Sequence, residues 1–308
     1  MSHNHHGHIH THERHEHDGG FSSLAFILVL SGLFMVAEIL GGLWSGSLAL
    51  LADSGHMAID TAAVALGLFA GWVSKKPPTN QKTYGYYRAE ILAATLNGAL
   101  LLVGSFWIFF EAWGRLQEPH PIQGGMMTVI AVGGLIVNLI GIGLLHRHEQ
   151  DNLNIRSVTL HLILDALGSV GAIVAGIAVW KYGVLWADSC VSILIAVLIL
   201  RGAYKLLSEC VDILLEAVPA GMDIEVLRQD LLGVSSVKDV HDLHVWTIAS
   251  GVIALSAHIK TAEGVDHGRV LKEACQMLHD KHGIDHATLQ LEPETFSHDD
   301  SHLHCQKP

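Results

Sequence analysis

Two pairs of histidine and aspartate with the same spacing stand in apolar stretches of the sequence. The first pair is His56 and Asp60 in SGHMAID, and the second is His161 and Asp165 in TLHLILD. Residues four apart lie on one face of an α-helix, with their Cβ atoms about 6 Å apart. If two such helices face each other, two imidazoles and two carboxylates meet, which is a donor set that suits tetrahedral Zn²⁺.

The alternative interpretation is that these residues are polar packing groups that form hydrogen bonds between helices. Ionisable groups are costly inside a membrane span and by default mark transport pathways. Because four of them occur at identical spacing in two segments, the pattern favours a metal site. Asp53 precedes His56 by one helical turn and is expected either to orient an imidazole or to cap part of the helix. Glu38 is expected to be an accessory polar residue.

The segments that carry these pairs are apolar enough to cross a membrane. Half of all residues are apolar and 16% are charged, against roughly 25% charged in soluble domains, and the mean hydropathy is +0.38. A hydrocarbon core of about 30 Å requires about 20 helical residues. Six segments meet this requirement, and they predict an all-α six-helix membrane bundle: 21–40, 47–73, 88–113, 126–145, 157–180 and 184–206.

Lysine and arginine residues predict the orientation of the six spans. Only Arg115 and Lys181 fall on the side opposite the termini. The side shared with the termini carries Arg14, Lys75, Lys76, Lys82, Arg88, Arg147, Arg156, Arg201 and Lys205. Such residues favour the cytoplasmic side, so both termini are expected in the cytoplasm. The short loops and the lack of organelle signals favour a bacterial inner membrane as the location.

The pattern changes near residue 208 to that of a small α+β domain. A helix, two strands, a helix and a last strand are predicted in turn, which fits a ferredoxin-like sheet with helices on one face. The expected organisation is a histidine-rich tail (1–20), a transport domain (21–207), a cytoplasmic domain (208–295) and a second histidine-rich tail (296–308). A small domain with an open sheet is often stabilised by pairing, so a homodimer is expected.

The chemistry of the four residues predicts how transport is driven. A zinc-binding imidazole must be neutral and a carboxylate ionised, so metal binding expels protons and protonation expels metal. Zn²⁺ export from the cytoplasm in exchange for H⁺ is therefore the predicted function. A membrane-bound zinc sensor and a passive zinc channel remain alternatives. The net charge of −12 argues against nucleic-acid binding, and the lack of GxxxxGK[ST] and HExxH motifs argues against an enzyme.

The motifs of the chain resemble those of the cation diffusion facilitator family, specifically its zinc-exporting branch. The resemblance rests on six spans, HMAID, HLILD, YGYYRAEILAA and VHDLHVW, and covers nearly the whole chain. It implies that His56, Asp60, His161 and Asp165 form the transport site in a homodimer that alternates between inward-open and outward-open states. The histidine at position 56 resembles the zinc-selective form, although Cd²⁺ and Co²⁺ remain open as substrates.

The resemblance also implies metal sites outside the membrane. Relatives bind zinc in the carboxy-terminal domain, and the matching positions are His241, His258, His286 and Glu292, with zinc as a regulatory ligand. Alternation along the last strand places His286 and Glu292 on one face, so a shared site is expected. The alternative for each histidine is solvent exposure or a hydrogen bond in the sheet. The histidine-rich tails, with eight histidines in the first 17 residues, are expected to bind metal loosely.

Overall fold

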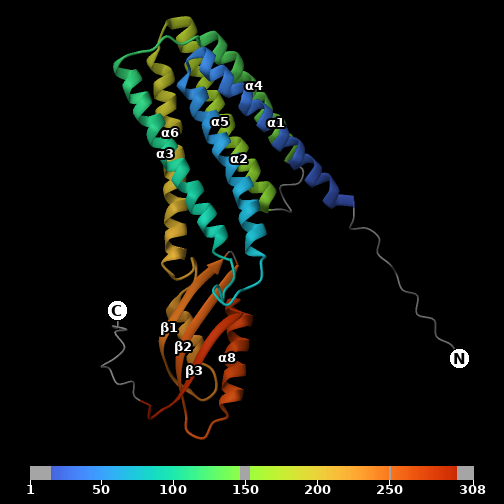
Figure 1. Ribbon diagram of the computed structural model, residues 1–308, viewed down its shortest axis with the longest axis vertical. Coiled ribbons are helices and arrows are strands. Elements are labelled where there is room, and N and C mark those ends of the chain that lie inside the picture. Colours follow the sequence, from blue (N-terminus) through green and yellow to red (C-terminus); the bar gives the residue numbers. More distant parts are fainter. Residues whose placement is uncertain (1–14, 146–152, 250, 297–308) are drawn as a thin grey trace, which may run out of the picture. The chain divides into compact units, whose positions relative to one another are not determined.

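The computed structural model describes residues 15–145, 153–249 and 251–296. Most of both histidine-rich tails lies outside these residues. The chain forms two compact units. The helix unit comprises Met1–Ala65 and Asn97–Tyr204, and the sheet unit comprises Leu66–Leu96 and Lys205–Pro308. Each unit is described by itself below (Figure 1).

Six long helices confirm the six predicted spans. They are α1 (His15–Ser45), α2 (Leu48–Ser74), α3 (Ala89–Gln117), α4 (Gly124–Leu145), α5 (Leu153–Tyr182) and α6 (Trp186–Leu214). All six are long and apolar enough to cross a membrane. Several extend past the expected apolar segments, and α6 continues to Leu214 instead of ending at 206. Apolar composition marks the part of a helix that lipid surrounds, whereas the helix ends where its backbone groups find other partners.

Small residues bring α4 and α5 into close contact within the helix unit. A Cβ on Gly124 would lie 2.6 Å from the carbonyl oxygen of Gly176, so neither helix tolerates a larger side chain there. Small residues at helix interfaces let backbones approach closely in membranes. A buried cluster of Ala49, Leu50, Met127, Ala131, Ala172 and Ala175 then joins α2, α4 and α5. Helix α4 also packs against α1.

The sheet unit contains the predicted α+β arrangement. The elements are α7 (Ile224–Leu232), β1 (Val237–Ala249), β2 (Val252–Thr261), α8 (His267–His282) and β3 (His286–Pro293). The strand order is β1-β2-β3, with β1 and β2 antiparallel and β2 and β3 parallel. Parallel strands need a crossover connection, which α8 provides. The order αββαβ agrees with a ferredoxin-like unit that begins at its first helix.

The core of the sheet unit lies between the sheet and its two helices. Leu227 and Leu231 of α7 and Ala274 and Leu278 of α8 pack against buried strand residues, which are Val240, Val245, Leu255, Ala257 and Ile259. Both helices therefore cover the same face. On β2 the core residues alternate regularly, but on β1 Val240 and Val245 are five apart. A bulge between His241 and His244 shifts the register and turns the strand so that both valines reach the core.

Candidate metal centre

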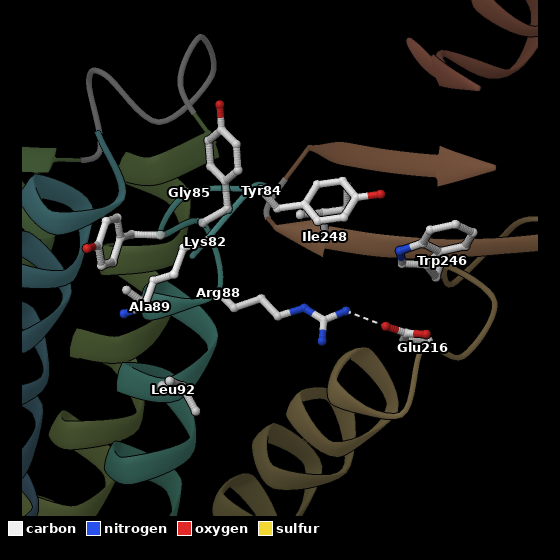
Figure 2. Close-up of a pocket in the computed structure, with 11 residues that line it drawn as sticks. Lys82, Tyr84, Gly85, Arg88, Ala89, Leu92, Glu216, Trp246 and Ile248 are labelled. Carbon is white, nitrogen blue, oxygen red and sulfur yellow. Dashed lines mark hydrogen bonds and ion pairs between the residues drawn. The ribbon is translucent and has the colours of Figure 1, made fainter. Parts of the chain in front are cut away.

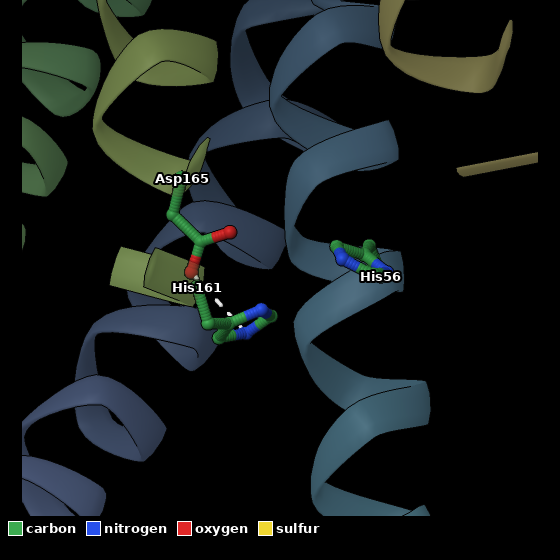
Figure 3. A group of neighbouring side chains, drawn as sticks. All are labelled: His56, His161 and Asp165. Atoms are coloured by element: carbon green, nitrogen blue, oxygen red, sulfur yellow. Dashed lines mark ion pairs between the residues drawn. The ribbon is translucent and has the colours of Figure 1, made fainter. Parts of the chain in front are cut away.

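The four residues of the two sequence pairs meet in the helix unit. His56 and Asp60 come from α2, and His161 and Asp165 come from α5. The Nε2 atoms of His56 and His161 each lie 3.4 Å from Oδ2 of Asp60, and His161 Nε2 lies 3.5 Å from Oδ2 of Asp165. The two imidazole rings have centroids 5.7 Å apart. Figure 3 shows His161 and Asp165 pointing from α5 towards His56 on the facing helix.

These separations fit the dimensions of a tetrahedral zinc site. With metal–ligand distances of about 2.0–2.2 Å, neighbouring donor atoms of a tetrahedron lie roughly 3.3–3.6 Å apart. The three nitrogen–oxygen separations, at 3.4–3.5 Å, are in this range. Donor atoms of His56, His161 and Asp165 also lie within 4.8 Å of one another. Asp60 lies outside this group of three, although its Oδ2 reaches both imidazoles at 3.4 Å, so binding of one ion by all four side chains requires Asp60 to shift towards Asp165.

The site is only partly closed. The side chain of Asp165 is 8% exposed, whereas that of His161 is 42% exposed. The Nδ1 atom of His56 is buried and has no hydrogen-bond partner among the described residues. An ion at this position therefore has an accessible side at His161 and a buried side at Asp165.

Asp53 does not have either role expected from the sequence. It does not orient His56, because no described group forms a hydrogen bond with His56 Nδ1. It does not cap α2, because that helix begins five residues earlier at Leu48. Instead, its carboxylate is buried beside α5, where a Cβ on Gly168 would lie 3.6 Å from Asp53 Oδ1. Local spacing could not reveal this contact between two helices.

A second cluster with metal-binding residue types lies in the sheet unit. His241 and His258 are direct partners on β1 and β2, with ring centroids 5.4 Å apart. Glu292 of β3 lies 3.4 Å from His241 Nε2 and 3.0 Å from His258 Nδ1. Donor atoms of these three residues lie within 4.8 Å of one another. The structure thus brings together three of the four residues that the sequence suggested.

His286 is the member of the expected set that lies elsewhere. It pairs with Ala254, whereas Gln290 pairs with His258, and its ring stacks edge-on against Tyr84 with centroids 5.6 Å apart. His286 and Glu292 do fall on one face of β3. However, six residues of strand separate them by about 20 Å, so the two side chains cannot share an ion within one chain.

Asp242 also belongs to this neighbourhood, although it was not among the residues predicted to bind metal. Its Oδ2 lies 3.6 Å from Nε2 of His258, and its Oδ1 lies 3.1 Å from Nε2 of His244. Regular alternation would place Asp242 on the face opposite His241. Its φ of +49° marks the bulge that changes its direction, and an aspartate tolerates this left-handed conformation better than most residues. The sequence VHDLHVW gave no sign of the bulge.

The sheet unit also contains a pocket with a different chemistry. A cavity of about 430 Å³ is lined by Lys82, Tyr84, Tyr86, Tyr87, Trp246 and neighbouring residues. Figure 2 shows the guanidinium group of Arg88 across this space from Glu216, with an Nη2–Oε1 distance of 2.8 Å. The single carboxylate of the lining is thus paired with a cation. This pocket lacks the donors of a zinc site.

Comparisons with known proteins assign the long helices and the αββαβ part to two family domains. The family model of the cation efflux transmembrane domain matches residues 24–215, and that of the cation efflux protein cytoplasmic domain matches residues 219–294. A solved structure of the metal-bound C-terminal domain of the CzcD transporter from Cupriavidus metallidurans is 38% identical. The alignment covers 23% of the present chain and 99% of the CzcD domain, with a TM-score of 0.22.

Three relatives align over most of the chain. The zinc transporter ZitB of Escherichia coli is 40% identical over 97% of this chain and 96% of its own. The metal cation efflux system protein CzcD of Cupriavidus metallidurans is 40% identical over 90% of this chain and 89% of its own. A cadmium, cobalt and zinc/H⁺-K⁺ antiporter of Bacillus subtilis is 37% identical over 95% of this chain and 96% of its own. These relatives confirm the prediction of a transporter rather than an enzyme, and the chain belongs to the cation efflux family of membrane proteins, also called cation diffusion facilitators.

Proposed function

We propose that this protein exports Zn²⁺ from the cytoplasm in exchange for protons, through a site formed by His56, Asp60, His161 and Asp165. The observation that carries the proposal is the meeting of two imidazoles and two carboxylates from α2 and α5, at separations of 3.4–3.5 Å, inside apolar helices. The names of the relatives, which include zinc transporters and an antiporter of cadmium, cobalt and zinc, support the same function.

Proton exchange follows from the ligand chemistry. Zn²⁺ binds the neutral form of histidine and the ionised form of aspartate, so protons and metal compete for the same atoms. Histidine changes its charge near neutral pH. A difference in proton concentration across the membrane can therefore load the site with zinc on one side and release zinc on the other.

The remaining parts of the proposal concern assembly and regulation. We infer a homodimer, which the match to the dimerising cytoplasmic domain supports. The cluster of His241, His258 and Glu292 is proposed to bind a regulatory zinc ion in the cytoplasm. Both termini are placed in the cytoplasm, with residues 21–207 as the transport domain and 208–295 as the cytoplasmic domain. A bacterial inner membrane is the proposed location.

Transport measured in proteoliposomes tests the proposed function. The purified protein is reconstituted with a zinc-sensitive dye inside and a pH gradient across the membrane. We expect zinc uptake that saturates with zinc concentration, follows the size of the gradient and moves protons in the opposite direction. A matched control is His120→Ala, since His120 is exposed outside the proposed site, whereas His161→Ala should abolish the flux.

The alternatives give different results in the same assay. A passive channel would carry zinc at a rate indifferent to the pH gradient. A membrane-bound sensor would bind zinc tightly without any flux. Either result would contradict the proposed exchange.

A further inference from the structure

Glu38 is a buried carboxylic acid that the four-residue site does not use. It lies on α1 and is 1% exposed. Its Oε2 atom is buried and has no hydrogen-bond partner among the described side chains. An ionised carboxylate without a partner is very costly in an apolar environment. Some other positive charge must therefore accompany Glu38 during at least part of the transport cycle.

The carboxyl group of Glu38 is tightly packed where α1, α4 and α5 meet. A Cβ on Gly134 of α4 would lie 2.8 Å from the ring of Phe34, 3.0 Å from Glu38 Oε1 and 3.1 Å from the hydroxyl oxygen of Ser169 on α5. Ser169 is 2% exposed, and its hydroxyl group also lacks a partner in the described part of the chain. Glycine at position 134 thus lets the carboxyl group of Glu38 and the hydroxyl group of Ser169 both pack against α4.

Ser169 continues the face of α5 that carries the metal site. His161, Asp165 and Ser169 follow one another at intervals of four residues, which places them on one side of the helix. On α2, Asp53 lies about one turn before His56, as Ser169 lies one turn after Asp165 on α5. Asp53 is buried against α5. Polar groups therefore extend from the metal site towards Glu38 along both helices.

The charged groups that face Glu38 are all acidic. Asp53 of α2 and Asp165 of α5 both repel a negative charge on Glu38. Helix α4 contributes no titratable residue, and no lysine, arginine or histidine of the described helices pairs with Glu38. Three carboxyl groups in one buried region cannot all be ionised without bound cations.

The arrangement favours a proton over a second metal ion as that cation. Donor atoms of the four proposed ligands approach a neighbouring ligand to 3.4–3.5 Å, whereas Glu38 belongs to no described group of convergent metal-binding side chains. A metal ion requires such convergence, whereas a proton requires only one oxygen. No hydrogen bond or ion pair among the described residues joins Glu38 directly to any of the four proposed ligands, so its protonation is not part of the metal coordination itself.

We propose that Glu38 carries a counterflowing proton, with Ser169 and Asp53 lining its route, in an inference that rests on the proposed exchange of Zn²⁺ for H⁺. When Zn²⁺ binds beside Asp165, its two positive charges repel the proton of Glu38. The O–H bond of Glu38 then breaks, and the proton leaves to the cytoplasm. When zinc departs on the opposite side, the carboxylate of Glu38 accepts a proton from that side.

Proton counting by calorimetry tests this role at equilibrium. Zinc is titrated into the detergent-solubilised full-length protein at pH 7 in buffers with different ionisation enthalpies, which yields the number of protons released per zinc ion. Glu38→Gln should lower this number by about one, because glutamine has no proton to give up. In proteoliposomes, the stimulation of zinc flux by a pH gradient should fall by about fivefold or more. Glu38→Asp, which retains a carboxyl group, should restore both.

Glu111→Gln is the matched control. Glu111 also lies in a membrane helix, but it is paired with Arg115 at 3.0 Å and is not among the charged groups that act on Glu38. The control should keep the proton count and the response to the gradient of the wild-type protein. An unchanged proton count in Glu38→Gln would overturn the role of Glu38. Zinc flux of the wild-type protein that ignores the gradient would instead overturn the proposed exchange, so the two failures are distinguishable.

Chemical labelling of the wild-type protein tests the same role without any substitution. Carbodiimides react with protonated carboxyl groups in apolar surroundings, and mass spectrometry locates the adduct. We expect labelling of Glu38 at pH 7 in zinc-free protein and protection by saturating zinc. Labelling that is absent from Glu38, or unaffected by zinc, would overturn the proposal even if Glu38→Gln failed to fold.

Discussion

The carboxylate of Asp188 accepts a hydrogen bond of 2.6 Å from the hydroxyl group of Ser47 and thereby joins the start of α6 to the start of α2. It also accepts hydrogen bonds from the backbone amides of Leu48 and Ala49, at 2.8 and 3.2 Å. The first amides of a helix have no partner within the helix, and Asp188 caps them from another helix. Because α2 carries His56 and Asp60, this cap helps to position half of the proposed metal site.

Asp188→Ala should therefore destabilise the helix unit. The substitution leaves buried amides of α2 without an acceptor, at a cost of about 1–3 kcal/mol. Thermal unfolding in detergent, followed by fluorescence-detected gel filtration, should show a lower transition temperature. Ser47→Ala removes the acceptor of one amide, that of Leu50 at 3.2 Å, but leaves the amides of Leu48 and Ala49 capped by Asp188, so it should show a smaller shift. Equal unfolding temperatures for Asp188→Ala and the wild-type protein would contradict the capping role.

His56→Asp should change the metal preference of transport. The substitution replaces an imidazole nitrogen by a carboxylate oxygen, and oxygen ligands suit Mn²⁺ better than nitrogen ligands do. We expect zinc flux to fall by on the order of tenfold and manganese flux to become measurable. Competition between the two metals in proteoliposomes measures this change. His120→Asp, at an exposed position, serves as the control, and retained zinc preference in His56→Asp would refute a ligand role.

His258→Ala and His286→Ala should have different effects on zinc binding by the sheet unit. His258 contacts Glu292 at 3.0 Å and faces His241, whereas His286 stacks on Tyr84. Zinc titration of the full-length protein should show the loss of one class of sites for His258→Ala, with affinity there reduced by about tenfold or more. His286→Ala should bind as the wild-type protein does. Weaker binding in both variants would mean that His286 contributes to the site.

Asp230 should make the stability of the sheet unit depend on pH in acid. Hydrogen bonds from Lys281 at 2.8 Å and His282 at 2.9 Å lower the pKa of this carboxyl group in the folded protein. Its stabilising contribution is therefore present above the unfolded pKa of about 3.9 and is lost as the pH falls through the lower folded pKa. Asp230→Asn should flatten this part of the stability profile.

Circular dichroism melts between pH 2 and pH 7 would measure the effect of Asp230. Asp280→Asn on α8 is a suitable control, because Asp280 has no ion pair among the described residues. A wild-type profile that matches that of Asp230→Asn throughout the acid range would show that the contacts with Lys281 and His282 do not stabilise the fold.

Local geometry made the placement of the two histidine–aspartate pairs predictable. The spacing of His56 from Asp60, and of His161 from Asp165, places each pair on one helical face regardless of what surrounds it. Apolar stretches of about 20 residues likewise predicted six spans, because lipid requires a continuous apolar surface. The α+β arrangement of the sheet unit was predictable because core-facing residues recur with one period in a helix and with another in a strand.

Contacts between distant segments depended on the tertiary structure. Alternation correctly placed His286 and Glu292 on one face of β3, but it carries no information on which strand neighbours lie beside each residue. The bulge at Asp242 interrupts the alternation of side chains along β1. It brings the carboxylate of Asp242 close to His258, whereas regular alternation would place this carboxylate on the opposite face. Asp53 and Glu38 were recognisable as polar residues in apolar helices, yet only the packing of α1, α4 and α5 places Glu38 beside Ser169. Helical and strand periods determine which face a residue occupies, whereas its neighbours follow from how complete elements pack together.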